Sequence, residues 1–353
     1  MKRSRPYPFH GAHKDKMAPH KGLQMSDQSQ NKTFLNMPWL LTWGGYILAM
    51  LGAFLFASKG IWIKLAYNYD IDASALMALR LSVATPFFVI FGLATFVRGK
   101  AKGTHNLPPI DRQPGLYLRA LAVGALGYWV ASYTDFESLT TLSPQFERLI
   151  LFTYPLFVIL FGAFFFKQPM RLKAVWAFII SYVGLGLVFI TDLRAQGTAV
   201  AVGVLWCTVS SVAFALYLLL AKPLIKRMGA SLFTSWAMSG AALATGIHFL
   251  AVHKLSDIHM TPPLLTLVIG LAIGATVLPS YLTNFALSRI SSQANAIISF
   301  INPIFTLILS GLILDEHITL ADIAGTLLVL AGVGLYIWID QRATRQEASV
   351  SKG

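Results

Sequence analysis

The chain alternates between long apolar stretches and short polar connectors. Ten apolar stretches can be read, each near the ~20 residues that an α-helix needs to cross the ~30 Å hydrocarbon core of a bilayer. In chain order they cover Gly44–Ala66, Ala73–Val97, Leu116–Tyr133, Pro144–Phe166, Leu172–Thr191, Ala199–Ala221, Ser231–Leu250, Leu264–Leu287, Gln293–Leu314 and Leu320–Ile339. The pattern predicts an all-α integral membrane protein with ten transmembrane helices. Because the connectors are too short for an independent domain, ligand chemistry is expected within or between the helices.

Composition agrees with a lipid environment. Hydrophobic residues make up 56% of the 353 residues and charged residues 12%, whereas soluble domains carry about 45–50% and about 25%. The net charge of +13 taken alone would also fit nucleic-acid binding. Most of the cations lie in the short connectors, however, so no nucleic-acid partner is expected and the lipid bilayer is the expected surroundings. The single cysteine, Cys207, excludes an intrachain disulfide.

The positive charges also predict the orientation of the chain. Residues 1–43 are polar and basic and are expected to form a disordered cytoplasmic tail. If this tail is inside, the connectors that share its side carry most of the Lys and Arg, and the opposite connectors carry only Arg194 and Lys254. Such an excess is typical of the cytoplasmic side. Both termini, including the tail of residues 340–353, are therefore expected in the cytoplasm, with the protein in a bacterial inner membrane.

An internal repeat relates the two halves of the chain. A shift of 148 residues aligns the third to fifth stretches with the eighth to tenth. The matched pairs include Pro114 and Pro262, Ser143 and Ser291, Gln145 and Gln293, Pro155 and Pro303, and Gly184 and Gly332. We interpret residues 44–191 and 199–339 as two five-helix repeats. Because five is odd, the second repeat would be inverted in the membrane, and inverted repeats allow alternating access around a central cavity.

Several short motifs carry a family resemblance. They are Arg80 in the second stretch, Tyr154-Pro155 and Asn302-Pro303 in the fourth and ninth, Asp315-Glu316 before the tenth, and the endings Gly184-x-Gly186 and Gly332-x-Gly334. With these motifs the sequence resembles the drug/metabolite transporter superfamily, and within it the ten-helix EamA-type permeases. The resemblance implies a secondary transporter of amino acids, vitamins or other metabolites, with many exporters among such proteins. The first repeat departs from the family pattern, with Lys167-Gln168 where an acidic residue is usual.

Ionisable residues within the apolar stretches are the first candidates for function. Each costs roughly 2.5–3.5 kcal/mol on insertion scales, so such residues usually mark a polar cavity. Arg80 and Lys59 are predicted to bind a substrate carboxylate or other anionic group, and the alternative is that either pairs with Glu147 to stabilise packing. Glu147 is interpreted as the only carboxylate well inside a stretch, which makes it the candidate for proton coupling. Lys64 is expected to reach the outer interface.

The second half offers uncharged polar groups at comparable positions. Tyr281, Asn284, Asn295 and Asn302 are predicted to bind substrate, because amides and hydroxyls supply both donors and acceptors. The alternative for each is a hydrogen bond between helices.

The paired prolines Pro155 and Pro303 are predicted hinges, with a static bend as the alternative. No metal site, cofactor or catalytic residue is expected.

These observations lead to one main functional hypothesis and two others. The main one is a secondary transporter that moves a small polar metabolite, such as an amino acid, by alternating access, with export favoured. The second is an uptake carrier or facilitator for a vitamin, nucleoside or similar solute. The third is an integral-membrane enzyme, for which the sequence offers no metal-binding, paired-acid or phosphate-binding motif. The partner is thus a small-molecule substrate, and a homodimer is left open.

Overall fold

The computed structural model describes residues 38–101, 113–166, 173–254, 256, 258–287, 289–290, 295, 298–299 and 301–350. The chain divides into two units, Met1–Leu41 and Thr42–Gly353. The described residues of the first unit, Pro38–Leu41, begin the first helix, and everything that follows concerns the second unit.

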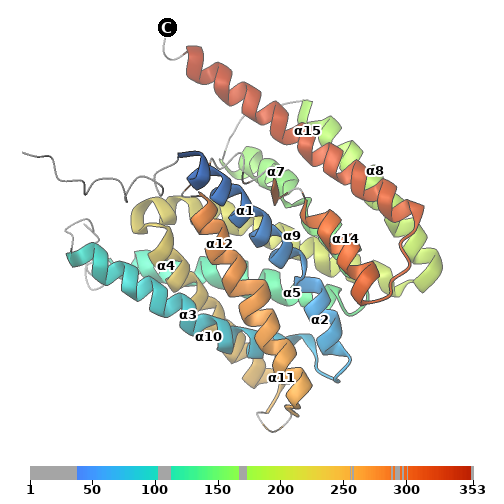
Figure 1. The fold of residues 1–353 in the computed structure, drawn as a ribbon, viewed down its shortest axis with the longest axis horizontal. Coiled ribbons are helices and arrows are strands. Elements are labelled where there is room, and N and C mark those ends of the chain that lie inside the picture. The colour runs from blue at the N-terminus through green and yellow to red at the C-terminus, as the bar shows by residue number, and fades with distance from the viewer. Residues whose placement is uncertain are drawn as a thin grey trace, which may run out of the picture. The chain divides into compact units, whose positions relative to one another are not determined.

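Helices account for nearly all of the described chain (Figure 1). They are α1 (Pro38–Ala57), α2 (Lys59–Tyr67), α3 (Ala73–Ala101), α4 (Pro114–Gly124), η1 (Ala125–Val130), α5 (Ala131–Ser138), α6 (Pro144–Leu151), α7 (Tyr154–Phe166), α8 (Lys173–Gln196), α9 (Ala199–Met228), α10 (Ala230–Val252), α11 (Pro262–Ile269), η3 (Gly270–Val277), α12 (Leu278–Leu287), α14 (Asn302–Ile313) and α15 (Leu320–Val350). The elements named η are π-helices. No strand occurs among these residues, which confirms the all-α prediction.

Several helical segments have the length and hydropathy of membrane spans. Among the described residues six qualify: Trp43–Tyr67, Ala73–Thr95, Pro144–Phe165, Ala199–Met228, Ala230–Val252 and Pro262–Thr283. Asn302–Ile313 and Leu320–Leu335 are shorter apolar helices. Large apolar side chains such as Phe164, Leu205 and Leu312 face outward, which is expected where the solvent is lipid. The structure thus agrees with an integral membrane protein, and the count of ten spans stays a prediction.

Two helix boundaries differ from the predicted ones. The disordered tail was expected to reach residue 43, but α1 already begins at Pro38. The reason is local, because Pro38 is a favourable first helical residue and the apolar sequence after it continues the helix. At the other end α15 continues to Val350, beyond the predicted end of the span at Ile339.

Two of the spanning segments are interrupted near their middle. Between α1 and α2 the interruption lies at Ser58, whose hydroxyl donates to the carbonyl of Leu55 (2.7 Å) and so competes with regular helix bonding. Between α6 and α7 it lies two residues before Pro155. A proline ring clashes with the carbonyl four residues earlier, here that of Leu151, which is the last residue of α6. The second repeat has a similar helix start, because α14 begins directly before Pro303.

The two π-helices were not predicted from the sequence. Shifted by 148 residues, η1 would cover 273–278, which overlaps η3 at Gly270–Val277. Pro114 and Pro262, which the same shift matches, both stand at the start of the helix that leads into the π segment. The repeat therefore extends from the sequence to a backbone irregularity that is rare in proteins and frequent at functional sites.

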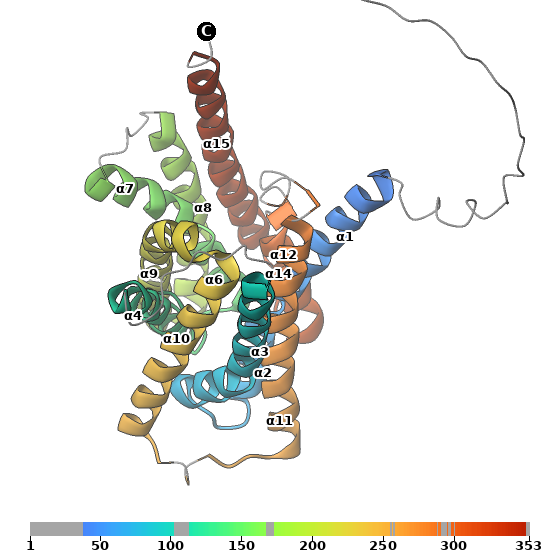
Figure 2. The same ribbon diagram turned by 90° about the vertical axis from the view of Figure 1, so that its left-hand side faces the viewer.

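The contact between α8 and α15 shows how the two repeats meet there (Figures 1 and 2). A Cβ atom at Gly184 would lie 2.8 Å from the carbonyl oxygen of Gly325, and one at Gly332 would lie 2.7 Å from that of Ala177. Ala177 thus meets Gly332, and Gly184 meets Gly325. Because residue numbers rise along α8 while those of the contacted residues fall along α15, the two helices are antiparallel. The shift by 148 exchanges Gly184 with Gly332 and Ala177 with Gly325. The contact is therefore reciprocal, as a two-fold relation between the helices requires.

Candidate functional site

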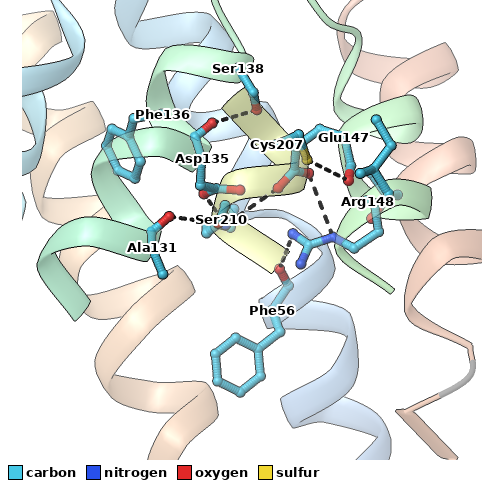
Figure 3. A network of polar contacts seen from close by, with 12 residues as sticks. Phe56, Ala131, Asp135, Phe136, Ser138, Glu147, Arg148, Cys207 and Ser210 are labelled. Carbon is cyan, nitrogen blue, oxygen red and sulfur yellow. Dashed lines mark hydrogen bonds and ion pairs between the residues drawn. The ribbon is translucent and has the colours of Figure 1, made fainter. Parts of the chain in front are cut away.

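A buried ion cluster joins the start of α2 to α5 and α6 (Figure 3). The Nζ atom of Lys59 lies 2.5 Å from Oδ2 of Asp135 and 3.5 Å from Oε1 of Glu147. The side chains of Asp135 and Glu147 are 3% and 0% exposed, so both carboxylates are removed from solvent. Arg148 adds a second cation, with its Nε atom 3.9 Å from Oε2 of Glu147. We call Lys59, Asp135, Glu147 and Arg148 the ion cluster.

The interruption of the first span places Lys59 in this cluster. Lys59 is the first residue of α2, directly after Ser58. An interrupted helix leaves backbone carbonyls without helical partners, and inside a membrane other groups must satisfy them. Here Arg148 Nη2 donates to the carbonyl of Phe56 (3.1 Å) and the Thr306 hydroxyl to that of Ala57 (3.1 Å). The first, fourth and ninth predicted spans therefore meet at one point.

Glu147 and Arg148 owe their positions to the beginning of α6. The Ser143 side chain caps this helix by accepting from the backbone N–H of Phe146 (3.2 Å), and Pro144 follows as the first helical residue. Glu147 then falls in the first turn, where the helix dipole favours a negative charge. The sequence Ser-Pro at this position thus fixes where the carboxylate lies.

Helix α9 holds α5 and α6 together behind the ion cluster. Cys207 donates from its Sγ atom to the backbone carbonyl of Glu147 (3.4 Å). The hydroxyls of Ser210 and Ser211 donate to the carbonyls of Ala131 (2.6 Å) and Ile150 (3.1 Å). Small polar side chains of this kind satisfy the backbone where helices approach closely in a membrane. The cysteine therefore has a packing role here.

Several charged atoms of the ion cluster lack hydrogen-bond partners. Among the described residues none donates within hydrogen-bond geometry to Oδ1 of Asp135 or to either carboxylate oxygen of Glu147. Most buried polar atoms in proteins are satisfied, so a group of unsatisfied ones requires an explanation. Two buried carboxylates in one site are costly when both are charged, and here Lys59 and Arg148 are the cations that compensate them. The arrangement is chemically suited to hold a proton, and equally suited to receive donors from a bound molecule.

Arg80 lies on the neighbouring α3, next to the ion cluster. Arg80 is 5% exposed, and its guanidinium carbon lies 4.8 Å from the centre of the Phe136 ring. Phe136 follows Asp135 in α5, and Asp135 is close enough to interact electrostatically with Arg80. The Nε atom of Arg80 has no hydrogen-bond partner among the described residues. The structure thus joins Lys59 to Glu147 directly and places Arg80 against Phe136, the residue that follows Asp135.

The polar residues of the second half lie apart from these contacts. Tyr281 donates from its hydroxyl to the carbonyl of Phe87 on α3 (3.2 Å). Asn295 accepts the Ser299 hydroxyl at its backbone carbonyl (3.0 Å). Asn302 begins α14, one turn before Thr306, and its Oδ1 atom is buried without a partner among the described residues.

The side chain of Asn284, a residue of α12, lies outside the described residues. Within the described part of the chain no contact joins Tyr281, Asn295 or Asn302 to the ion cluster, and the role of all four residues in substrate binding stays a prediction. The same holds for Pro155 and Pro303 as hinges, although a helix begins directly before each of them.

Asp135 is the functional candidate that sequence reasoning missed. The third apolar stretch of the sequence ends at Tyr133, so the hydrophobic pattern leaves Asp135 in a connector and Glu147 as the only carboxylate well inside a stretch. The structure corrects this, because α5 continues to Ser138 and buries Asp135 to 2% exposure. The helical spacing of Ala131, Asp135 and Ser138, all on one buried face, was the available signal.

A second acidic group lies outside the spans, near the start of α15. Burial raises the pKa of Asp192 to about 6, and the nearby charges of Asp322 and Glu316 add to the rise. Burial also raises the pKa of Glu316, opposed by a hydrogen bond from the Ser310 hydroxyl. Glu316 belongs to the Asp-Glu motif noted in the sequence.

Comparison with known proteins gives one family for both halves. Residues 43–190 and 201–338 match the EamA-like transporter family. The "Uncharacterized transporter YcbK" of Bacillus subtilis (strain 168) is 28% identical over 286 residues, which are 80% of this chain and 88% of that protein. The "Uncharacterized transporter YcxC" of the same organism is 22% identical over 319 residues, which cover 85% of this chain and 95% of that protein. A crystal structure at 15% identity covers 85% of this chain and 98% of its own with a TM-score of 0.56, which is a likeness of fold alone.

Proposed function

Because the chain belongs to the EamA-like transporter family, we propose that it is a secondary transporter that carries a small polar metabolite by alternating access, in the direction of export. The substrate class is an amino acid or a related solute with an anionic group. The protein has ten transmembrane helices in this proposal, with both termini in the cytoplasm. Membership of a transporter family also favours transport over an enzymatic reaction.

The observation that carries the proposal is the ion cluster at two interrupted helices. In secondary transporters, discontinuous helices form substrate and coupling sites near the middle of the membrane. Here the interruptions at Ser58 and before Pro155 bring Lys59, Glu147 and Arg148 into contact. Charged residues at such depth are costly, and a purely structural role would be served as well by apolar packing. A carrier, in contrast, uses buried charged residues to bind an anionic substrate or a coupling proton.

The proposed cycle, in which the two halves exchange conformations, uses inverted repeats. Support comes from the antiparallel, reciprocal contact of α8 with α15, the last helices of the two halves. Two copies of one unit that cross the bilayer in the same direction would place these helices parallel. In the proposed cycle the halves exchange conformations, and Pro155 and Pro303 act as hinges because each starts a helix without a backbone N–H of its own.

The roles of individual residues follow from their chemistry. Arg80 binds the substrate carboxylate, because a guanidinium pairs with a carboxylate through two parallel hydrogen bonds, and Lys59 assists. Tyr281, Asn284, Asn295 and Asn302 bind the remaining polar groups of the substrate. Glu147 carries the coupling proton together with Asp135, and Lys59 neutralises whichever carboxylate is charged.

A transport assay in proteoliposomes tests the proposal. Efflux of a panel of labelled amino acids is compared for wild type, Arg80→Ala and Arg194→Ala, the last being an exposed arginine outside the spans. We expect Arg80→Ala to abolish flux at normal expression and Arg194→Ala to retain it. Wild-type flux in Arg80→Ala would remove Arg80 from the site. Inverted and right-side-out vesicles distinguish export from the alternative, an uptake carrier for a vitamin or nucleoside.

A further inference from the structure

A groove lies away from the ion cluster, where α4 begins and α9 ends. It has a volume of about 610 Å³, within the range of small-ligand sites. Arg119 and Arg227 line it together with apolar residues, among them Leu220 and Leu224. None of the residues that we assign to substrate binding belongs to it, so this groove requires a separate explanation.

The polar end of the groove is positively charged for three reasons. Arg119 and Arg227 are both exposed, and among the described residues neither forms an ion pair. The N-terminus of α4 adds the positive end of a helix dipole. Gln113 stands at the capping position of α4, but its side chain makes no capping hydrogen bond. Pro114 has no N–H and that of Leu116 donates to the carbonyl of Gln113 (3.1 Å), so among the described residues only the N–H of Gly115 in this turn remains available to an anion.

The internal repeat shows that the fold does not require an arginine here. The shift by 148 residues places Leu267 at the position of Arg119, in the otherwise matching helix α11. A leucine serves the same packing position in the second half. Arg119 is therefore available for a function other than packing.

The opposite end of the groove is apolar and continuous with the outer surface of the helices. Leu220 is 39% exposed, and Leu118, next to Arg119, is 67% exposed. Helix α9 is long and apolar enough to cross the membrane, and Arg227 lies in its last turn. The groove thus combines a cationic end at the level of the membrane surface with an apolar end at the level of the acyl chains.

We propose that this groove binds an anionic phospholipid. The phosphate lies between Arg119 and Arg227, and an acyl chain packs along Leu220 and Leu224. Arginine pairs with phosphate through two parallel hydrogen bonds, and basic sites between transmembrane helices bind anionic headgroups. A free soluble anion would leave the apolar part of the groove without a partner, so a lipid matches the groove along its whole length.

Native mass spectrometry of the full chain in an uncharged detergent tests this site. Dioleoylphosphatidylglycerol is titrated against dioleoylphosphatidylcholine for wild type, Arg119→Gln/Arg227→Gln and the control Arg289→Gln, which removes an exposed arginine elsewhere. Each basic residue near the membrane surface contributes about fivefold to the binding of anionic lipid. We expect preferential binding of phosphatidylglycerol by wild type, about 25-fold weaker binding by the double variant, and no change in the control.

A second variant obstructs the groove without removing charge. Gly115 lines the groove, and a Cβ there meets no atom within 4 Å, so Gly115→Phe is expected to place its ring in the groove. We expect it to weaken phosphatidylglycerol binding as well. Equal binding by wild type and the double variant, equal binding of phosphatidylcholine, or displacement of the lipid by inorganic phosphate alone would each overturn the proposal. The groove shares no residue with the proposed transport site, so failure of either proposal leaves the other standing.

Discussion

Removing the lysine of the ion cluster is the sharpest test of how the site is held together. In Lys59→Met, Asp135 and Glu147 stay buried at 3% and 0% side-chain exposure, and Arg148, 3.9 Å from Glu147, is the one ion-pair partner left to them among the described residues. Taking one partner from a buried ion pair costs about 3–5 kcal/mol, because the remaining charge is left without compensation. We therefore expect Lys59→Met to lower the free energy of unfolding by about that amount.

The same reasoning predicts that a second substitution repairs most of the loss. Asp135→Asn removes the charge that Lys59→Met leaves unpaired, so the double variant is expected to be more stable than Lys59→Met alone. Thermal unfolding of purified protein in detergent measures this. At about 2 °C per kcal/mol for a chain of this size, the single variant should unfold about 6–10 °C below wild type. Lys64→Met, which removes a partly exposed lysine from the same helix, is the matched control and should unfold near wild type.

Two results would refute this account of the ion cluster. One is a Lys59→Met protein that unfolds at the wild-type temperature, since the lysine would then contribute nothing. The other is a double variant whose loss equals the sum of the two single losses. Additive losses are expected of independent sites, whereas residues in one ion network couple by about 0.5–3 kcal/mol.

Three further predictions concern coupling, pH and packing. Glu147→Gln should abolish the response of transport to an imposed pH gradient in proteoliposomes, and an unchanged response would limit Glu147 to packing. Because the pKa of Asp192 is raised to about 6, folding favours its protonated form, and its contribution to stability is lost as pH rises from about 4 to about 6. Asp192→Asn should therefore unfold at a higher temperature than wild type above pH 6, with the gain disappearing near pH 4, and a constant difference would contradict this. Gly124→Ala should lower the free energy of unfolding by about 1–3 kcal/mol, and with it the unfolding temperature, because the new Cβ would lie 2.1 Å from the carbonyl oxygen of Ala237. Gly115→Ala, where a Cβ meets nothing within 4 Å, should not.

The membrane environment and the repeat could be predicted because they depend on averages over many residues. A run of about 20 apolar residues has few alternatives to a membrane helix. Shared positions such as Pro155 and Pro303 are also hard to match by chance over 148 residues. The helical character of the whole described chain followed from these features alone.

Features that depend on one or two residues could not be predicted in this way. The interruption at Ser58 contains no proline, and the carbonyls that it leaves without helical partners are satisfied by Arg148 and Thr306 from distant helices. The burial of Asp135 was missed for a related reason. Its charge suggested a connector, and only the tertiary contact with Lys59 compensates for its position inside the protein. Charged residues near the end of an apolar stretch are ambiguous until their partners are known.

The two halves share backbone features and differ in charge, and this combination has a mechanistic consequence. The π segments and the reciprocal glycine contacts follow the shift by 148 residues. The carboxylates do not, because Thr283 stands at the position equivalent to Asp135 and Asn295 at that of Glu147. A symmetric backbone gives two exchanged conformations similar packing energies. A ligand shifts an equilibrium only through its different affinity for the two states. Because the ion cluster lies in one half alone, the energy difference between the two conformations would depend on protonation and on bound substrate. The asymmetry of the ion cluster is thus what would allow a proton to drive a carrier with a symmetric fold.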